Sequence, residues 1–193
     1  MALSTGFKKT KTAVFISGKG SNLKSLIKFS KKKKSPISIN LIVSNNHKSK
    51  GLGIAKKFKI QSKIFNFKKK SISERKILFE LKKKNINLIC LAGFMKILSK
   101  YFVKNYKGKI LNIHPSLLPK YKGLNTHKRV IINKEIYSGC TVHYVNYKLD
   151  SGKIIMQKKV KIRRNDTPNS LSKRILIQEH KLYPKAILKI FNL

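Results

Sequence analysis

The sequence TAVFISGKGSNLKSLIKF, residues 12–29, decides the fold class. Its first part, residues 12–17, is an apolar run that is too short for a helix and stops at a glycine, which is typical of a buried strand. Residues 21–29 then repeat apolar side chains at helical spacing, and Ser21 or Asn22 can cap this helix. A strand, a glycine-containing turn and a helix in this order predict the first unit of an α/β fold.

The same alternation continues along the chain. Apolar or alternating runs predict further strands at 37–44, 63–67, 86–94, 109–115, 138–147 and 153–162. Helical spacing predicts helices at 51–59, from Ser73 onwards, at 125–134 and from Thr167-Pro168 onwards, with a kink at Pro184. Strands that are apolar on both faces predict a mostly parallel central sheet with helices on both faces. In such a sheet, ligands bind at the carboxyl ends of the strands. The loops expected there are 17–22, 93–98, 112–127 and 146–152.

Length and composition are those of one globular domain, residues 1–193. There is no internal repeat and no linker rich in Pro, Gly or Ser, and residues 1–11 are expected to be a flexible tail. No apolar run approaches the roughly 18 residues of a membrane-spanning helix, and the N-terminus lacks the order of regions found in secretory signals. We therefore expect no membrane partner.

The net charge of +40 comes from 46 Lys and Arg residues and only 6 Asp and Glu residues. Such a charge normally suggests a nucleic-acid partner. However, only five of these residues are Arg, the preferred side chain for phosphates and base edges, and the Lys residues are spread along the whole chain. Because Lys, Ile and Asn all have AT-rich codons, we interpret the charge mainly as codon drift. Nucleic-acid binding, if present, is expected to be non-specific.

Cys90 and Cys140 lie in apolar stretches without the spacing of a metal site. The simplest interpretation is two small buried hydrophobic side chains in a reduced, cytoplasmic protein. No metal site is expected.

Two segments carry residues suited to chemistry. ISGKGSN, residues 16–22, is a glycine-rich turn before a helix; it is either an ordinary tight turn or a place where backbone amides hold an anion. LNIHPSLLP, residues 111–119, puts Asn112 and His114 on the same face at the end of a strand. An amide can donate to a developing oxyanion, and an imidazole beside it can transfer a proton.

The chain has only six acidic residues against 46 basic ones, so each of the six is a candidate for a specific role. Glu74, Glu80 and Glu135 have the context of solvated helix or turn charges, and Asp166 that of a turn or cap residue. Glu179 shares the apolar face of the predicted last helix, so it needs a buried partner.

Asp150, the sixth acidic residue, follows the strand predicted at 138–147. It either orients His114 and favours its protonated form, or only makes a turn.

Five segments together resemble the phosphoribosylglycinamide formyltransferase family, in order and spacing, from about residue 12 to 190. They are ISGKGSNL (16–23), LAGFMKILS (91–99), LNIHPSLLPKYKGLNTH (111–127), GCTVHYV (139–145) with LDSG (149–152), and QEHKLYP (178–184). The resemblance implies a Rossmann-like formyltransferase fold and formyl transfer in purine synthesis, from 10-formyltetrahydrofolate to the amine of phosphoribosylglycinamide. Attack of the amine on the formyl carbon would form a tetrahedral oxyanion.

The resemblance also assigns residues to roles. The catalytic residues that it implies are Asn112, His114 and Asp150. The residues implied for the phosphoribosyl substrate are Gly20, Ser21, Asn22 and Glu179. The residues implied for folate are Met95, Lys96, Ile97, Leu98, Asn112, Asn146, Tyr147, Lys148, Leu149 and Asp150. A monomer or a homodimer is expected.

Some positions depart from the family. Lys19 and Lys96 stand where the family often carries Asn and Arg. Arg75 is shifted by one position from a folate-contacting Arg, and Glu74 takes the aligned place.

Three alternatives to this activity remain open: the catalytic domain of a methionyl-tRNA formyltransferase, a formyltetrahydrofolate deformylase and a basic nucleic-acid-binding protein without enzymatic activity. The segment GLNTH, residues 123–127, argues against the first. The last leaves the arrangement of Asn112, His114 and Asp150 unexplained.

Overall fold

The computed structural model describes residues 8–193. Its strands are β1 Thr10–Ile16, β2 Ile37–Ser44, β3 Ser62–Ile64, β4 Leu88–Leu91, β5 Lys109–His114, β6 Tyr137–Tyr144 and β7 Ile154–Lys161. Its helices are α1 Ser21–Ser30, α2 Lys50–Lys57, α3 Lys70–Lys83, α4 Lys100–Asn105, α5 Thr126–Ile132 and α6 Pro168–Ile190, with a 3-10 turn η1 at Phe67–Lys69.

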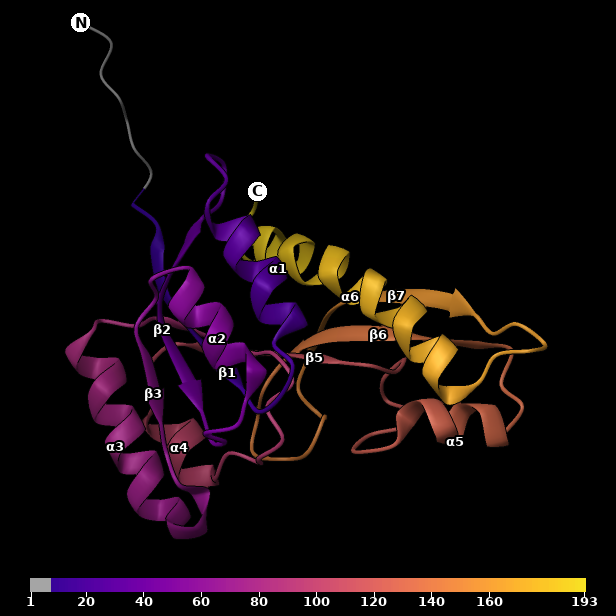
Figure 1. The fold of residues 1–193 in the computed structure, drawn as a ribbon, viewed down its shortest axis with the longest axis horizontal. Helices are drawn as coiled ribbons and strands as arrows, with labels where there is room; N and C mark the ends of the chain where they lie inside the picture. The colour runs from indigo at the N-terminus through magenta and orange to yellow at the C-terminus, as the bar shows by residue number, and fades with distance from the viewer. Residues whose placement is uncertain (1–7) are drawn as a thin grey trace, which may run out of the picture.

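The strands form one seven-stranded sheet in the order β3-β2-β1-β4-β5-β6-β7 (Figure 1). The first five strands in this order run parallel, whereas β6 pairs antiparallel with both β5 and β7. The prediction of a mostly parallel α/β sheet is therefore confirmed. The reversal at β6 matters for the site, because it brings a strand running in the opposite direction alongside the end of β5.

Helices cover both faces of the sheet, and the two faces hold separate cores. Val14 and Ile16 of β1 pack with α1 and α6 in one core, and Ala13 and Phe15 pack with α3 and α4 in the other. Successive strand residues point to opposite faces, so a strand must be apolar throughout to serve both cores. This is the physical reason for the continuous apolar run at 13–16. Helices α1 and α6 lie side by side on their face (Figure 1).

The N-terminal boundary differs from the prediction. Residues 10 and 11 were expected in a flexible tail, but they belong to β1 and pair with Ile37 and Ser38. The Thr10 amide also donates to the Pro36 carbonyl at 2.8 Å. Pairing with β2 overrides the polar local sequence here. Residues 8 and 9 of that predicted tail precede β1, and the Lys9 ammonium donates to the Ser30 carbonyl at 2.8 Å, whereas residues 1–7 lie outside the described residues.

Two other local predictions need correction. Ser73 was expected to start a helix, but α3 begins at Lys70, and the Ser73 hydroxyl donates to the Asn66 carbonyl at 2.7 Å. The predicted caps Ser21 and Asn22 lie inside α1, whose cap is Gly20 in the left-handed conformation. A tight turn that ends in a glycine does not need a side-chain cap.

Helix α6 runs continuously from Pro168 to Ile190 and contains Pro184, where the sequence predicts a kink. Proline has no amide hydrogen, so the carbonyl of His180, four residues earlier, loses its helical donor. The Ser25 hydroxyl of α1 donates to that carbonyl at 3.0 Å. A side chain of the neighbouring helix therefore replaces the missing bond.

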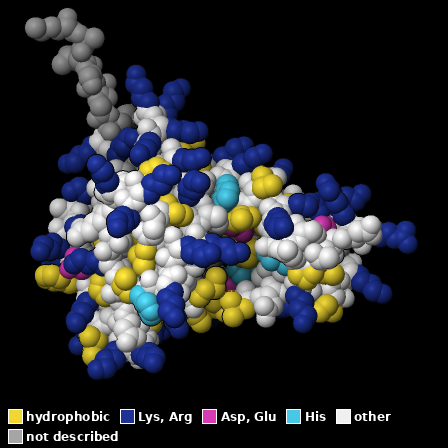
Figure 2. Space-filling view, in the orientation of Figure 1, with side chains coloured by type: hydrophobic (Ala, Val, Ile, Leu, Met, Phe, Trp, Pro, Cys, Tyr) yellow, Lys and Arg dark blue, Asp and Glu magenta, His cyan; other side chains and the backbone are white. Residues whose placement is uncertain are grey.

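Lysine and arginine side chains are spread over the visible face of the molecule rather than gathered in one patch (Figure 2). Among residues 8–193, Lys63, Lys120 and Arg174 are the Lys and Arg side chains within ion-pair distance of a carboxylate. The lysines that are spread along the sequence are therefore also spread over this face of the fold. No helix in the described part of the chain is long and apolar enough to cross a membrane.

Candidate active site

Three of the residues singled out from the sequence meet at the end of β5. Asn112 and His114 lie two residues apart on that strand. Asp150 comes from the loop between β6 and β7, and its Oδ2 lies 3.3 Å from His114 Nδ1. Its Oδ1 accepts a hydrogen bond from the Asn112 amide at 3.4 Å. The structure thus brings an amide, an imidazole and a carboxylate together, which the sequence alone left undecided for Asp150.

Asp150 is held by its backbone as well as by its partners. It has a φ of 44°, in the left-handed region that Asp tolerates better than most residues. Its Oδ2 also accepts from the amide of Gly123 at 2.9 Å. The side chain is only 8% exposed, so its interactions with His114 are weakly screened by solvent.

Both ring nitrogens of His114 face acceptors. Nδ1 faces Asp150, and Nε2 lies 2.8 Å from the carbonyl oxygen of Tyr121. A carbonyl oxygen only accepts, so Nε2 carries a hydrogen. Nδ1 is consequently the nitrogen that faces the cluster and can exchange a proton there.

His143 is a fourth member of this cluster that sequence reasoning missed. In the antiparallel pair of β5 and β6 it lies opposite Asn112, and its Nε2 is 3.2 Å from the Asn112 amide nitrogen and 3.7 Å from Asp150 Oδ1. Its Nδ1 contacts the Tyr144 carbonyl at 2.8 Å. Burial lowers the pKa of His143, so it is a neutral acceptor at pH 7. The sequence shows a histidine in the alternating strand predicted at 138–147. Only the pairing register of β5 and β6 reveals that this histidine lies opposite Asn112.

The glycine-rich turn lies at the carboxyl end of β1. Gly20 has a φ of 76°, and a Cβ there would lie 2.7 Å from the Cα of Gly51. Only glycine fits this turn, which leads directly into the N-terminus of α1. The first amides of a helix have no partners within it and can bind an anion.

The Asn22 and Glu179 side chains meet beside that turn. The Asn22 amide donates to Glu179 Oε2 at 2.6 Å, and the Asn22 Oδ1 atom is buried without a partner. Burial raises the pKa of Glu179. One turn further along α6, the Tyr183 hydroxyl lies 3.1 Å from the carbonyls of Leu91 and Leu111. Tyr183 thus fixes the Glu179 face of α6 against the end of β4 and the middle of β5.

The segment expected to contact folate follows β4. Met95 and Ile97 are 63% and 56% exposed, Lys96 is also exposed, and Leu98 is buried. The Met95 amide donates to the Ser17 hydroxyl at 2.8 Å, which ties the segment to the end of β1.

The second segment expected to contact folate precedes Asp150. Tyr147 and Leu149 are 53% and 47% exposed, Lys148 is exposed, and the Asn146 side chain accepts from the Lys148 amide. The Lys100 ammonium lies 5.5 Å from the centre of the Tyr147 ring, so this loop approaches the end of the first segment.

Glu74 corrects a sequence prediction. It was expected to be a solvated helix charge, but it is 1% exposed. Its Oε1 accepts from the Ser99 amide at 2.8 Å and its Oε2 accepts from the Ser99 hydroxyl. Ser99 in turn caps α4, directly after the exposed segment 95–98. Glu74 therefore holds the residue that follows that segment. This contact joins residues 25 positions apart, so the local helix context of Glu74 could not reveal it.

Asp166 fits its prediction, since it binds Arg174 and accepts from the Arg163 amide. Glu80 lies on α3 as predicted, but its side chain is only 16% exposed and pairs with Lys63. The two cysteines are buried and free, as predicted, and burial raises the pKa of each thiol to about 12. Within residues 8–193, no group of three or more His, Cys, Asp and Glu side chains is placed to hold a metal ion. A metal-free site stays a prediction.

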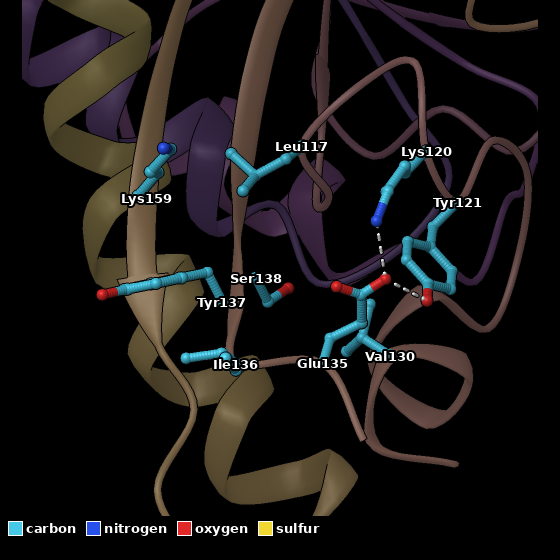
Figure 3. Close-up of a pocket in the computed structure, with 9 residues that line it drawn as sticks. All are labelled: Leu117, Lys120, Tyr121, Val130, Glu135, Ile136, Tyr137, Ser138 and Lys159. Carbon is cyan, nitrogen blue, oxygen red and sulfur yellow. Dashed lines mark hydrogen bonds and ion pairs between the residues drawn. The ribbon is translucent and has the colours of Figure 1, made fainter. Parts of the chain in front are cut away.

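Figure 3 shows the residues that line a separate cavity of about 340 Å³. Its wall includes Leu117, Tyr121, Glu135, Ser138 and Lys159. Asn112, His114, His143 and Asp150 do not line it, and its wall comes from the loop after β5, from α5 and from β6 and β7.

The sequence profile of the Formyl transferase family matches residues 10–187. The chain belongs to this family. In the formyl transferase family, the chain is similar to phosphoribosylglycinamide formyltransferase of Escherichia coli, with 38% identity over 177 residues that cover 90% of this chain and 84% of the relative. It is 42% identical to the crystal structure of phosphoribosylglycinamide formyltransferase from Anaplasma phagocytophilum, with a TM-score of 0.88, covering 93% of this chain and 85% of that one.

A third relative is much longer. The human trifunctional purine biosynthetic protein adenosine-3 is 41% identical over 183 residues, which cover 93% of this formyl transferase chain but only 18% of the human protein. The chain thus spans less than a fifth of that relative's length. The Rossmann-like formyltransferase fold expected from the sequence is confirmed by these similarities.

Proposed function

We propose that this protein transfers a formyl group from 10-formyltetrahydrofolate to the amine of N1-(5-phosphoribosyl)glycinamide, a step of purine biosynthesis. The observation that carries the proposal is the meeting of Asn112, His114 and Asp150 at the carboxyl end of β5, the same edge of the sheet as the turn before α1. The names of the similar E. coli and A. phagocytophilum proteins support the same activity.

The acceptor would bind between the turn and α6. Backbone amides at Gly20, Ser21 and Asn22 would hold its phosphate, because the N-terminus of α1 carries partial positive charge and no acidic residue in its first turn. Glu179 would accept hydrogen bonds from the sugar-glycinamide portion in addition to the bond from Asn22. The unpartnered Asn22 Oδ1 can accept a further one.

The donor would bind over the two exposed segments, 95–98 and 146–149. Met95, Ile97, Tyr147 and Leu149 leave large apolar surfaces in solvent at this end of the sheet, and a flat aromatic ligand would cover them. Lys96 and Lys148 add positive charge suited to an acidic tail. When bound, 10-formyltetrahydrofolate supplies the formyl carbon that the amine attacks.

Asn112, His114 and Asp150 would act on the reacting atoms. The Asn112 contacts of 3.2 and 3.4 Å are long, so a formyl oxygen that gains negative charge can replace one of them. His114 would supply a proton through Nδ1 to the folate nitrogen as the bond between that nitrogen and the formyl carbon breaks, and the attacking amine would lose one proton in return. Asp150 would stabilise the charged imidazole. His143 accepts from the same amide and would keep its hydrogens directed into the cluster.

The test is an assay of the purified protein with both substrates. We expect folate-product absorbance to rise only when phosphoribosylglycinamide is present, and mass spectrometry to find its formylated form. Donor breakdown without an acceptor would instead indicate a deformylase. Formylation of methionyl-tRNA alone would indicate the tRNA enzyme. RNA binding that weakens steeply with salt, without any transfer, would favour the nucleic-acid-binding alternative.

We propose a single formyltransferase domain that acts in the cytoplasm as a monomer or homodimer, without a metal, and that binds nucleic acid only non-specifically. Size-exclusion chromatography with light scattering tests the oligomeric state directly.

A further inference from the structure

Tyr121 connects two parts of the molecule. Its side chain is anchored at the wall of the cavity: the hydroxyl donates to Glu135 Oε1 at 2.8 Å and accepts from the Asn133 amide at 3.0 Å. The guanidinium carbon of Arg129 lies 5.3 Å from the centre of its ring. In Figure 3, Tyr121 and Lys120 both reach Glu135. These contacts fix the side chain on three sides.

The backbone of Tyr121 faces the opposite way, toward the catalytic candidates. Its carbonyl oxygen lies 2.8 Å from His114 Nε2 and 3.3 Å from the Ser116 hydroxyl, which donates to it. This carbonyl is the acceptor that leaves His114 Nδ1 facing Asp150. The orientation of the imidazole thus depends on where the backbone at Tyr121 lies.

That backbone is in an unusual conformation. Tyr121 has a φ of 56°, in the left-handed region that residues with a side chain rarely adopt. Neighbouring contacts must hold such a residue in place. The hydroxyl bonds to Glu135 and Asn133 and the Arg129 guanidinium near the ring are contacts that can do so.

Glu135 is a suitable anchor. Hydrogen bonds from Lys120 and Tyr121 hold its pKa below the usual value, so it remains a charged acceptor at neutral pH.

We propose that Tyr121 is a positioning residue for His114, with its hydroxyl anchored on Glu135 so that its carbonyl fixes the Nε2–H form of the ring. The effect on turnover rests on the proposed function. The effect on the orientation and tautomer of the His114 ring does not depend on the proposed function.

Two variants remove the hydrogen bond between the Tyr121 hydroxyl and Glu135 without replacing the backbone at Tyr121. Tyr121→Phe removes only the hydroxyl, and Glu135→Ala removes its acceptor, whereas Glu135→Gln keeps an acceptor oxygen. Lys120→Ala is the matched control, because Lys120 also binds Glu135 Oε1, at 3.0 Å, but is largely exposed and does not contact His114.

The first measurement is long-range ¹H–¹⁵N NMR of the histidine rings, with the His114 signal identified by its loss in His114→Asn. In the wild type we expect a slowly exchanging Nε2–H. We expect it to broaden or shift in Tyr121→Phe and Glu135→Ala, and to match the wild type in Glu135→Gln and Lys120→Ala.

The second measurement is steady-state kinetics of formyl transfer. We expect kcat to fall about tenfold in Tyr121→Phe and Glu135→Ala with KM for both substrates nearly unchanged, less than the roughly 100-fold that a misplacement of about 1 Å can cost. A wild-type His114 signal and kcat in both variants would overturn the proposal. Absence of transfer in the wild type would overturn the proposed function but leave the NMR test of the ring in force.

Discussion

Replacing Asp150 by Asn tests the cluster most directly, because it changes charge with little change in shape. In the structure, Asp150 Oδ2 faces His114 Nδ1 at 3.3 Å and also accepts from the Gly123 amide. Asparagine can keep one acceptor oxygen for these partners, but it cannot balance a positive charge on the imidazole.

The expected loss follows from that distance. Two unit charges 3.3 Å apart interact by about 5 kcal/mol at an effective dielectric constant of about 20. Removing all of it from the transition state would slow turnover roughly 5,000-fold. The asparagine oxygen and local water recover part of it, so we expect kcat to fall between about 100-fold and about 5,000-fold.

The assay is the rate of formyl transfer from 10-formyltetrahydrofolate to phosphoribosylglycinamide, with circular dichroism to check folding. Asp166→Asn is the matched control. It makes the same chemical change at a carboxylate that binds Arg174 and Ser170 at the start of α6, away from the cluster. We expect it to lower thermal stability and keep kcat. Wild-type kcat in Asp150→Asn would refute the assignment of a catalytic charge to Asp150.

Four further outcomes are expected. His114→Ala should remove most turnover with little loss of folding, so a wild-type rate in the folded variant would remove His114 from the mechanism. Ser25→Ala should destabilise the protein by about 1 kcal/mol in urea unfolding, because it leaves the His180 carbonyl without a donor, and this cost should shrink in a Pro184→Ala background; an equal cost in both backgrounds contradicts the account. Burial raises the pKa of Glu179, so the native state binds that proton more tightly than the unfolded chain, and the contribution to stability falls as pH rises above 4.5 toward the raised value. Glu179→Gln should therefore be more stable than the wild type at pH 7 with a smaller advantage near pH 4, and a difference that does not vary with pH would count against this. Finally, added salt or a polyanion should raise Tm, since the net charge of +40 repels itself, and a flat Tm across ionic strength would contradict that.

The parallel part of the fold was predictable because its signal is local. Each buried strand is a short apolar run, and each is followed by a helix or a turn. Asn112 and His114 were found for the same reason, since two residues apart on one strand share a face. The carboxyl end of the sheet was predictable as the place of the site from the strand pattern alone.

Contacts between segments distant in the sequence were not predictable in this way. His143 joins the cluster only through the antiparallel register of β5 and β6, and Glu74 reaches Ser99 from another helix. Thr10 and Lys11 look like a polar tail until β2 lies beside them. In each case a contact with a distant segment decides where the residue lies. The hydrophobic periodicity of a single sequence does not reveal such contacts.

The acidic residues have a consequence for how this chain tolerates mutation. All six have an identified partner: Glu74 binds Ser99, Glu179 binds Asn22, Asp150 lies in the cluster, and Glu80, Glu135 and Asp166 each pair with a basic side chain. An average protein carries many surface carboxylates whose loss changes little. Here, any single exchange of an acid for lysine disrupts a specific interaction, so a mutational scan should find all six positions less permissive than the lysines around them.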